Sequence, residues 1–396
     1  MWSDEKMVAI SDITYVTVYK DEEKKHAVNQ VNVKQLKNGD VVMVFNEERG
    51  PIHADTGQTC LIRSKDGGMT WDPSTKVVVL PYNEYYGNWD CGLAQLSDGT
   101  LIVNVSVCAY FKPGIIDREL AEFAQRELGE EQSRYLDLLY REFILRGNGW
   151  VGTVVLKSKD NGYTWSHPIP VNARPLKHAG NRLGVLELPN KTLLLGVYGR
   201  ITGYGEAGEY ETSRAALLRS DDYGDNWEYY STIAYDPASI LNFTEPALIR
   251  LEDGRLLCML RVEARPSGRA LHMMYTISEN DGEYWSRPKP TNIWGYPAEI
   301  IQLQDGRYLM VYGYRRPPWG VRGCISEDGI TWDVKNEFII RKGGVASPKE
   351  RLQYWHIGYP SCCQLKDGTI LVAYHVYSDD KPPIQYIECA MFELKD

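Results

Sequence analysis

Ser158-Lys-Asp-Asn-Gly-Tyr-Thr-Trp165 is an eight-residue stretch, here called the box, that the chain repeats with small changes. It recurs at 64–71, 220–227, 278–285 and, one residue shorter, 326–332. Its Ser and its Asp or Asn can bond nearby backbone N–H groups, its Gly permits a positive φ, and its Trp re-enters a strand to be buried. We interpret the box as a hairpin turn and not as a row of catalytic aspartates, because acids that lie far apart cannot converge on one substrate.

A second repeat is a Leu followed by a tight turn, mostly of the Asn-Gly or Asp-Gly kind. It occurs six times, at 36–40, 96–100, 188–192, 251–255, 303–307 and 365–369. Such turns join adjacent antiparallel strands, and the runs that flank them are strand-like. Each unit therefore reads as inner strand, tight turn, second strand, loop, third strand, box and fourth strand, which is a four-stranded blade.

The repeats predict an all-β protein, a six-bladed β-propeller of four-stranded antiparallel blades. A period of about 50 to 60 residues argues for one radial structure over 1–396 and against several unrelated domains. The blades are expected at 26–80, 81–175, 176–238, 239–292, 293–345 and 346–396. The strand-like run at 8–18 has no turn of its own, so we expect it to complete the last blade beside 384–394 and close the ring.

One segment, 113–147, departs from the strand pattern. Ile116, Leu120 and Phe123 recur at helical spacing, and apolar residues resume that spacing after Gly129 amid alternating Glu and Arg. We predict a small helical insertion in the second blade. It is either a cover on the propeller edge, or a contact for a homo-oligomer or a wall of the substrate cleft.

Bulk composition excludes several classes of partner and cofactor. The formal charge of −9 gives no reason to expect nucleic acid or an acidic membrane as partner. The eight Cys include no CxxC, several lie in strand-like runs, and no His/Cys spacing suits a metal, so we expect neither disulfides, nor a metal, nor a cofactor. The first residues have no basic region followed by an apolar core, which favours a cytoplasmic protein unless a signal was removed.

The start of each inner strand is where residues from different blades can meet at the axis. These positions hold Gln30, Trp89, Arg182, Glu245, Pro297 beside Tyr296, and Tyr359. Charged groups at the narrow end of such a funnel must be paired or must bind something, because leaving them desolvated and unpaired is costly. We therefore expect a polar binding site at this end.

The boxes and their spacing resemble the Asp-boxes of the sialidase (neuraminidase) superfamily, whose fold is a six-bladed β-propeller. The resemblance covers the chain apart from 113–147 and implies specific site residues. After the second strand of the first blade it implies a substrate-binding Arg49 and an acid/base Asp55, with His53 close by. On the fourth blade it implies Glu245 and then Arg261.

The same resemblance implies an Arg on the fifth blade and a Tyr at the start of the last inner strand. Tyr359 supplies the latter, and the candidates for the former are Arg315, Arg316 and Arg322, of which Arg315 is our choice. Sialidases also begin their first inner strand with an Arg of a three-arginine clamp on the substrate carboxylate, but this chain has Gln30 there. Arg182 is the candidate substitute. Losing one charge-assisted partner, worth about 1.5 to 3 kcal/mol, is enough to change substrate preference.

These residues predict an exo-acting glycoside hydrolase for a terminal acidic sugar. Asp55 is the general acid/base, Tyr359 the nucleophile and Glu245 its activating base. The expected substrate contacts are Arg49, His53, Trp89, Asp90, Arg182, Arg261, Arg315 and His356. The alternatives are an exo-arabinanase or a polysaccharide lyase on the same fold, or a propeller that binds carbohydrate without cleaving it. In this last case Tyr359 is a packing aromatic and Glu245 a structural partner of Arg261 or Arg182.

Overall fold

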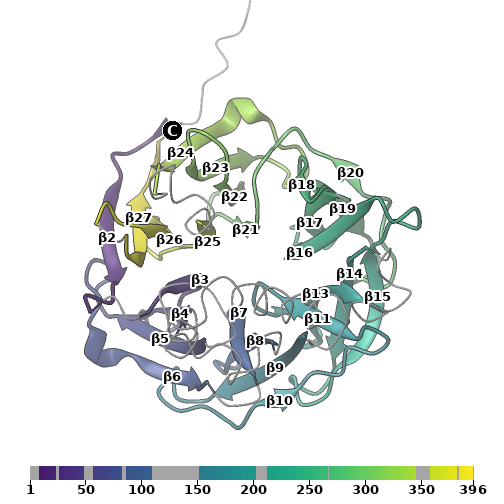
Figure 1. Cartoon of the computed structure of the whole chain (residues 1–396), viewed down its shortest axis with the longest axis horizontal. Helices are drawn as coiled ribbons and strands as arrows, with labels where there is room; N and C mark the ends of the chain where they lie inside the picture. The colour runs from purple at the N-terminus through teal and green to yellow at the C-terminus, as the bar shows by residue number, and fades with distance from the viewer. Residues whose placement is uncertain are drawn as a thin grey trace, which may run out of the picture.

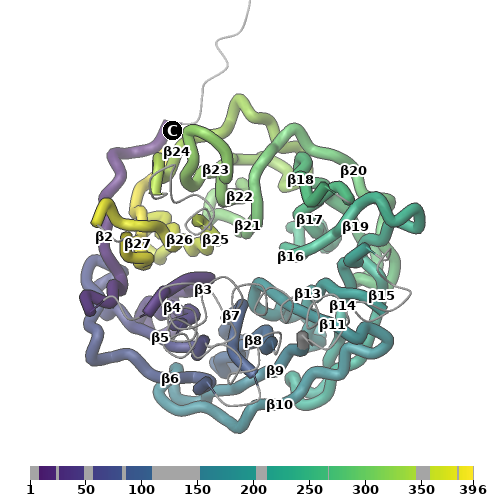
Figure 2. Tube along the Cα trace, in the orientation of Figure 1, coloured from purple at the N-terminus to yellow at the C-terminus, as the bar shows by residue number. Residues whose placement is uncertain are grey.

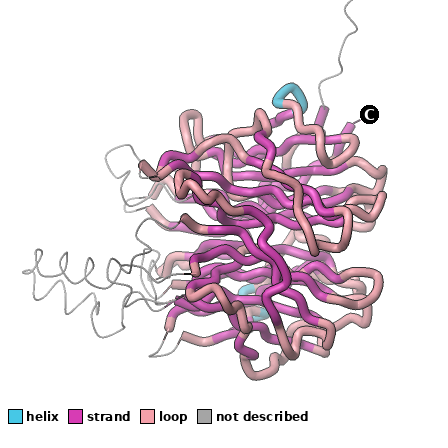
Figure 3. Tube along the Cα trace, turned by 90° about the vertical axis from the view of Figure 1, so that its right-hand side faces the viewer, coloured by secondary structure: helices cyan, strands magenta, loops and turns pink. Residues whose placement is uncertain are grey.

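Six antiparallel sheets stand around a central axis as the blades of a propeller (Figure 1). The computed structural model describes residues 9–23, 26–48, 57–82, 86–108, 151–201, 212–265, 267–344, 357–380 and 383–395. In Figure 2 the chain passes once around the axis, so that blades consecutive in sequence are neighbours in space. The side view in Figure 3 shows the strands running between the two faces of the disc. The predicted all-β, six-bladed architecture is confirmed.

Blades 1 to 3 follow the first half of the chain, each from the axis outward. Blade 1 contains β3 (Val28–Gln35), β4 (Val41–Glu47), β5 (Gln58–Ser64) and β6 (Val77–Leu80). Blade 2 contains β7 (Gly87–Gln95), β8 (Leu101–Cys108), β9 (Val151–Ser158) and β10 (Ile169–Pro170). Blade 3 contains β11 (His178–Asn181) and β12 (Leu186–Glu187), then β13 (Leu193–Arg200), β14 (Arg214–Ser220) and β15 (Glu228–Ala234).

Blades 4 to 6 repeat this order. Blade 4 contains β16 (Leu241–Arg250), β17 (Leu256–Ala264), β18 (Arg269–Ala270), β19 (Met274–Ser278) and β20 (Lys289–Pro290). Blade 5 contains β21 (Ala298–Gln302), β22 (Tyr308–Tyr314), β23 (Gly320–Ser326) and β24 (Glu337–Lys342). Blade 6 contains β25 (Gly358–Gln364), β26 (Ile370–Tyr377), β27 (Gln385–Phe392) and β2 (Thr14–Tyr19). The helices of the described residues are two 3-10 turns, η1 (Pro73–Thr75) and η3 (Val334–Asn336). The predicted insertion at 113–147 lies outside the described residues.

The N-terminal strand closes the ring as predicted. β2 pairs antiparallel with β27, with Thr14 opposite Met391, so the outermost strand of blade 6 comes from the start of the chain. The short β1 (Ala9–Ile10) pairs with β28 (Leu394–Lys395) and adds a second contact between the two ends. In Figure 1 the purple β2 lies beside the yellow β27. The closure covers an edge of blade 6 that would otherwise be open to pairing with another chain.

The core consists of six apolar layers, one at each junction between neighbouring blades. β4 shows how a strand serves two layers: Val41, Met43 and Phe45 pack toward blade 6, while Val42 and Val44 pack toward blade 2. A strand that is buried on both faces is apolar at successive positions instead of alternating. This is why the second strand of each blade reads as a continuous apolar run.

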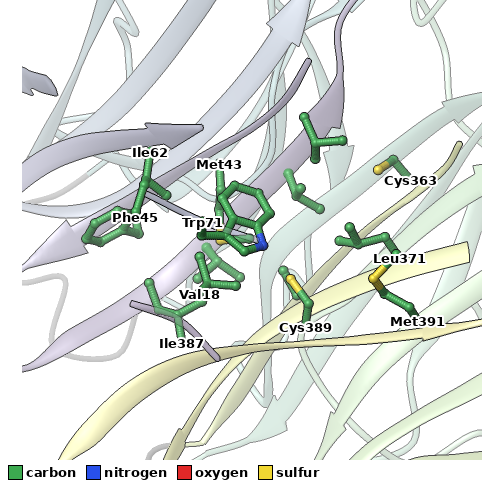
Figure 4. Close-up of a cluster of buried hydrophobic side chains, with 14 of the residues drawn as sticks. Val18, Met43, Phe45, Ile62, Trp71, Cys363, Leu371, Ile387, Cys389 and Met391 are labelled. Carbon is green, nitrogen blue, oxygen red and sulfur yellow. The ribbon is translucent and has the colours of Figure 1, made fainter. Parts of the chain in front are cut away.

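The layer between blades 6 and 1 is drawn in Figure 4. Trp71, the last residue of the first box, lies among side chains of both blades, with Met43 and Ile62 from blade 1 and Leu371 and Met391 from blade 6. Val18 of β2 belongs to the same layer. The first and last blades are therefore joined by packing as well as by the strand exchange.

The boxes form the turns that the sequence predicts. In the box at 158–165, Ser158 Oγ donates to Asp160 at 2.7 Å and accepts the N–H of Gly162 at 2.8 Å. Asp160 accepts the N–H of Thr164 at 2.9 Å, and Trp165 Nε1 donates to the carbonyl of Gly162 at 3.2 Å. The corresponding contacts recur in the other four boxes. The carboxylate of each box Asp is therefore hydrogen-bonded within its own turn.

A set of hydrogen bonds, here called the girdle, joins neighbouring blades at their tight turns, except between blades 3 and 4. In four blades the side chain just before the turn Leu accepts a backbone N–H from the tight turn of the preceding blade. The donor and acceptor pairs are Lys366 and Gln35 (2.9 Å), Lys37 and Gln95 (2.8 Å), Ser97 and Glu187 (2.6 Å), and Gln304 and Gln364 (2.7 Å). Between blades 4 and 5, Tyr308 accepts the N–H of Glu252 at 3.0 Å instead. The turn of blade 3 carries Pro189, which has no N–H to donate. The girdle spans the junction between blades 6 and 1 and thus contributes to closure.

Candidate active site

Four inner strands are interrupted at the same place near their start. Pairing with the second strand breaks for two residues in β3, β7, β16 and β25, at 30–31, 89–90, 245–246 and 359–360. Three residues at these breaks have left-handed backbone: Gln30 (φ 54°), Glu245 (φ 48°) and Tyr359 (φ 47°). Such a φ is uncommon for residues other than Gly and costs roughly 1 to 3 kcal/mol. Bulges of this kind re-aim side chains, which lets residues of non-adjacent blades meet.

Tyr359 of blade 6 and Glu245 of blade 4 meet across the axis. Tyr359 Oη donates to Glu245 Oε1 at 2.9 Å, and both side chains are buried. Arg261 Nη1 lies 3.0 Å from both carboxylate oxygens of Glu245. Arg261 also donates through Nε to Glu263, at 3.1 Å, and pairs with it through Nη2 at 2.5 Å. The guanidinium therefore holds Glu245 in place against the phenol.

Arg315 of blade 5 completes this group from a third side. Its guanidinium carbon lies 4.7 Å from the ring centroid of Tyr359 and 5.2 Å from that of Tyr296, and its Nε donates to the carbonyl of Ile357 at 3.0 Å. Arg261 lies 4.3 Å over the same Tyr296 ring. Tyr296 thus contacts two guanidinium groups, and cation–π contacts of this kind add to their fixation.

Of the three candidate arginines of blade 5, Arg315 is the one in contact with Tyr359. Arg316 lies 4.3 Å over Trp294 and donates to Tyr314 at 2.7 Å. Arg322 is paired with Glu337 of the outer strand. Arg315 is therefore the candidate that the structure brings to Tyr359, and its role as a substrate contact stays a prediction.

Arg182 reaches the backbone at Tyr359. Its side chain is 1 % exposed, and Nη2 donates to the carbonyls of Tyr359 at 2.9 Å and Pro360 at 3.1 Å. Nη1 donates to the carbonyl of Val31 at 3.4 Å. This guanidinium is engaged with the backbone of blades 6 and 1. The expectation that Arg182 replaces the missing arginine as a direct carboxylate ligand does not fit this position.

Burial and charge shift the ionisation of the central groups. Burial raises the pKa of Tyr359 above its usual range and the charge of Glu245 raises it further, against the opposing effect of Arg315 and Arg261. Burial alone would lower the pKa of Arg261, but Glu245, together with Tyr359 and Glu263, outweighs this and raises it well above the ordinary value. The phenol is therefore neutral and Arg261 is charged at neutral pH.

Tyr198 and His375 belong to this neighbourhood but were not predicted. Burial raises the pKa of Tyr198, and Asp90, Glu245 and Tyr359 raise it further. The His375 ring stacks on Tyr359 with centroids 5.7 Å apart. Both residues lie on second strands, β13 and β26, where they read as ordinary members of a strand. Their signal in the sequence is only a polar or aromatic residue near the end of an apolar run.

The remaining predicted residues divide into two sets. Asp90 and Trp89 lie at the interruption of β7, and Asp90 is buried. Its charge contributes to the raised pKa of Tyr359. Four predicted residues lie outside the described residues: Arg49, His53, Asp55 and His356.

Gln30 takes the ring position on blade 1 where the resemblance implies an arginine. Its Oε1 accepts from Asn46 at 3.3 Å, and its backbone N–H donates to Nδ1 of His375 at 3.2 Å. Since His375 stacks on Tyr359, the backbone N–H of Gln30 is linked to the pair of Tyr359 and Glu245 through the His375 ring. The neutral side chain of Gln30 thus occupies the ring position where the resemblance implies a positively charged one.

Within the described residues, no group of three or more His, Cys, Asp or Glu side chains is arranged to hold a metal ion. Nor does any helix of this part of the chain have the length and apolar composition needed to cross a bilayer. The eight cysteines are buried and form no disulfide with one another.

Comparisons with known proteins agree with this fold. Residues 138–372 match the family model of the BNR repeat-like domain. A crystal structure of a protein of unknown function from Dyadobacter fermentans is similar with a TM-score of 0.75 and 22 % identity, over 97 % of this chain and 99 % of that one. The K499G mutant of NanB sialidase from Streptococcus pneumoniae gives 0.64 and 13 %, over 96 % and 71 %. An α-L-arabinanase from Penicillium chrysogenum, complexed with arabinobiose, gives 0.62 and 13 %, over 95 % and 98 %. A comparison with curated proteins gives no match.

Proposed function

Because the chain belongs to the BNR repeat-like family, whose propeller it shares with the sialidases, we propose that it is an exo-acting glycoside hydrolase for a terminal acidic sugar. The observation that carries this proposal is the buried hydrogen bond from Tyr359 to Glu245. A phenol that donates to a carboxylate is arranged to attack as it loses its proton. Arg261 and Arg315 supply positive charge around the same atoms.

In the proposed reaction Tyr359 Oη bonds to the anomeric carbon while its proton passes to Glu245. The bond from that carbon to the leaving oxygen breaks, and the general acid protonates the leaving group. Water then attacks the anomeric carbon of the tyrosyl–sugar intermediate, the same acid/base group accepts a proton from this water, and Glu245 returns its proton to Tyr359. Two displacements give net retention of configuration. Asp55, which lies outside the described residues, is the proposed acid/base group.

A neutral nucleophile suits a negatively charged sugar. A carboxylate nucleophile would be repelled by a substrate carboxylate close to the anomeric carbon, whereas a phenol is not. The raised pKa of Tyr359 keeps this group neutral before the reaction. Arg261 is already shared by Glu245 and Glu263, so we assign the principal contact with the substrate anion to Arg315.

The neutral Gln30 bears on which acidic sugar is cleaved. With an amide in place of a guanidinium, the site offers one charge-assisted contact fewer, worth about 1.5 to 3 kcal/mol. We therefore propose that true sialosides are poorer substrates than glycosides of another acidic sugar, such as a uronic acid.

The test is a panel of aryl glycosides that includes sialyl, glucuronyl, arabinosyl and rhamnosyl forms. We expect turnover of an acidic member, and a loss of about a thousandfold or more in kcat for Tyr359→Phe and for Asp55→Asn. Tyr374→Phe is the matched control, because it also removes a buried Tyr–Glu hydrogen bond, 2.8 Å to Glu388, but on the outer side of blade 6. This variant should keep its activity.

Other outcomes separate the alternatives. An ultraviolet-absorbing unsaturated product from a polysaccharide would identify a lyase. Turnover of the arabinosyl glycoside alone would identify an arabinanase. Affinity for sugars without turnover of any would leave a carbohydrate-binding propeller, and full activity in both Tyr359→Phe and Asp55→Asn would remove the assigned roles.

A further inference from the structure

Arg182 starts on blade 3 but its side chain ends at the backbone of two other blades. Its guanidinium donates to the carbonyls of Tyr359 and Pro360 on blade 6 and to that of Val31 on blade 1. These two carbonyls of blade 6 belong to the interruption of β25, where Tyr359 has its left-handed φ. One side chain therefore ties three blades together directly under the proposed nucleophile.

The backbone on both sides of Arg182 is itself fixed by blade 2. Ser106 accepts the N–H of Asn181 at 2.7 Å and donates to its carbonyl at 3.0 Å. Asn104 Nδ2 donates to the carbonyl of Leu183 at 2.9 Å. Arg182 is thus held between two pinned neighbours, so that its reach toward blade 6 starts from a fixed point.

Two glycines allow this arrangement. A Cβ on Gly92 would lie 2.2 Å from the carbonyl carbon of Leu183, and a Cβ on Gly184 would lie 2.3 Å from the carbonyl oxygen of Leu93. Backbones of blades 2 and 3 therefore touch at a place where no side chain fits. The contact between the two backbones lies at residues 183–184, directly after Arg182, and so fixes the point from which the Arg182 side chain extends toward the axis.

We propose that Arg182 is a positioning residue, which holds the left-handed backbone at Tyr359 and so keeps the phenol on Glu245. The consequence for catalysis rests on the proposed function, but the positioning itself does not. A left-handed tyrosine persists only when its surroundings over-determine it. Two charge-assisted bonds to the carbonyls of Tyr359 and Pro360, with the guanidinium 5.3 Å from the ring of Tyr359, provide that constraint.

The competing interpretation is that Arg182 only fills the centre of the propeller. Lys34 is a matched control for this role. It too is a cation that crosses the axis, from blade 1 to Glu299 of blade 5 at 2.7 Å, and Glu299 in turn accepts the N–H of Cys362 on blade 6 at 2.9 Å. Lys34 contacts neither Tyr359 nor its carbonyl in the described hydrogen bonds. A general loss of central packing should therefore affect Lys34→Met and Arg182→Met alike.

The first measurement is kcat and KM on the best aryl glycoside for wild type, Arg182→Met, Arg182→Lys and Lys34→Met. We expect Arg182→Met to lose about a hundredfold in kcat, the usual cost of a misplacement near 1 Å, with KM within about threefold of wild type. Arg182→Lys, which can still reach one carbonyl, should recover about a tenfold part of that loss. Lys34→Met should stay within about twofold of the wild-type kcat.

The second measurement does not depend on turnover. With 3-fluorotyrosine incorporated at position 359, the ¹⁹F resonance should be single in wild type and Lys34→Met, and shifted or split in Arg182→Met and less so in Arg182→Lys. If wild type cleaves no glycoside, the proposed function fails while this resonance still decides the positioning role. An unchanged resonance in Arg182→Met, or equal losses of kcat in Arg182→Met and Lys34→Met, would overturn the proposal.

Discussion

At the scale of single residues, the central question is where the proton of Tyr359 resides. Burial and the nearby Glu245 both favour the neutral phenol, so the free protein contains no preformed phenolate. A nucleophile in this state has to lose its proton during the attack. Glu245, fixed by Arg261, is the acceptor that the geometry provides. The proposed mechanism thus depends on the base as much as on the nucleophile.

The raised pKa of Tyr359 should be visible in its titration. The phenolate absorbance of wild type and Tyr359→Phe should coincide up to about pH 11, because an ordinary tyrosine has a pKa of about 10 and this one is raised. A raised pKa also means that the folded protein holds the proton more tightly than the unfolded chain. The stability that Tyr359 contributes is therefore present in full below about pH 10 and declines as the pH rises further. A difference of one ionised tyrosine between the two proteins near pH 10 would contradict the prediction.

Residues at strand starts could be predicted from the sequence, whereas residues on second strands could not. Glu245 and Tyr359 were found because they stand at a fixed distance before a recognisable turn. His375 stacks on Tyr359 from the second strand of blade 6, and Asp90 and Glu245 raise the pKa of Tyr198 on the second strand of blade 3; both relations depend on blade geometry. Arg182 was predicted as a substrate contact, and its hydrogen bonds to backbone carbonyls cannot be read from residue types.

At the scale of elements, the boxes were predicted in detail because all their contacts are local. Within each box the Ser, Asp, Gly and Trp bond one another within a few residues. The fourth box has Asn280 where the others have Asp, and its Oδ1 still accepts the N–H of Tyr284 at 3.0 Å. The turn therefore needs a side-chain oxygen at this position to accept the N–H, and the negative charge of Asp strengthens that hydrogen bond without being essential for it.

We expect Asp160→Ala to lower the free energy of unfolding by about 1 kcal/mol, as for loss of a capping residue, and Asp160→Asn by clearly less. Partial burial opposes the effect, but the hydrogen bonds from Thr164 and Ser158 prevail and lower the pKa of Asp160 to about 2. Since an unfolded Asp has a pKa of about 3.9, the advantage of Asp over Asn is present above pH 4 and is lost as the pH falls toward 2. Urea unfolding at pH 7 and pH 3 measures this. An advantage equal at both pH values would refute the role of the charge.

The girdle was not predicted, because its bonds join residues that lie far apart in the sequence, 58 residues for Lys37 and Gln95 and 331 for Lys366 and Gln35. A glutamine before the turn Leu is visible in the sequence, but its partner is set by the spacing of the blades. Gln35 and Gln302 make a fair comparison. Both donate to the carbonyl of their own turn glycine at 3.4 Å, and Gln35 also accepts the N–H of Lys366 across the junction of blades 6 and 1.

We therefore expect Gln35→Ala to destabilise the protein by about 1 kcal/mol more than Gln302→Ala, which is the usual net value of one hydrogen bond. Denaturant unfolding of the two variants, with equal m-values, is the appropriate measurement. Equal changes would mean that the bond from Lys366 contributes nothing to closure.

At the scale of the whole molecule, the site exists only because the ring is closed. Tyr359 comes from blade 6, Glu245 from blade 4 and Arg315 from blade 5, and Arg182 links blade 3 to blades 6 and 1. No blade carries more than a part of this group. The position of blade 6 depends in turn on blade 1, through the layer around Trp71 and through β2. Stability at this junction and geometry at the site are therefore coupled.

This coupling predicts the effect of removing the N-terminal strand. Deletion of residues 1–20 removes β2 and with it the hydrogen bond of 2.7 Å from Tyr19 to Glu47, exposing the apolar edge of β27. We expect such a protein to self-associate on size-exclusion chromatography, to unfold at lower denaturant, and to lose turnover together with the single fluorine signal of Tyr359. Deletion of residues 1–13 removes the short pair of β1 with β28 and the hydrogen bonds between Ser11 and Glu393, but it spares the pairing of β2 with β27 and should retain at least about half the activity. A monomeric, fully active protein without residues 1–20 would show that blade 6 holds Tyr359 against Glu245 without help from the first strand.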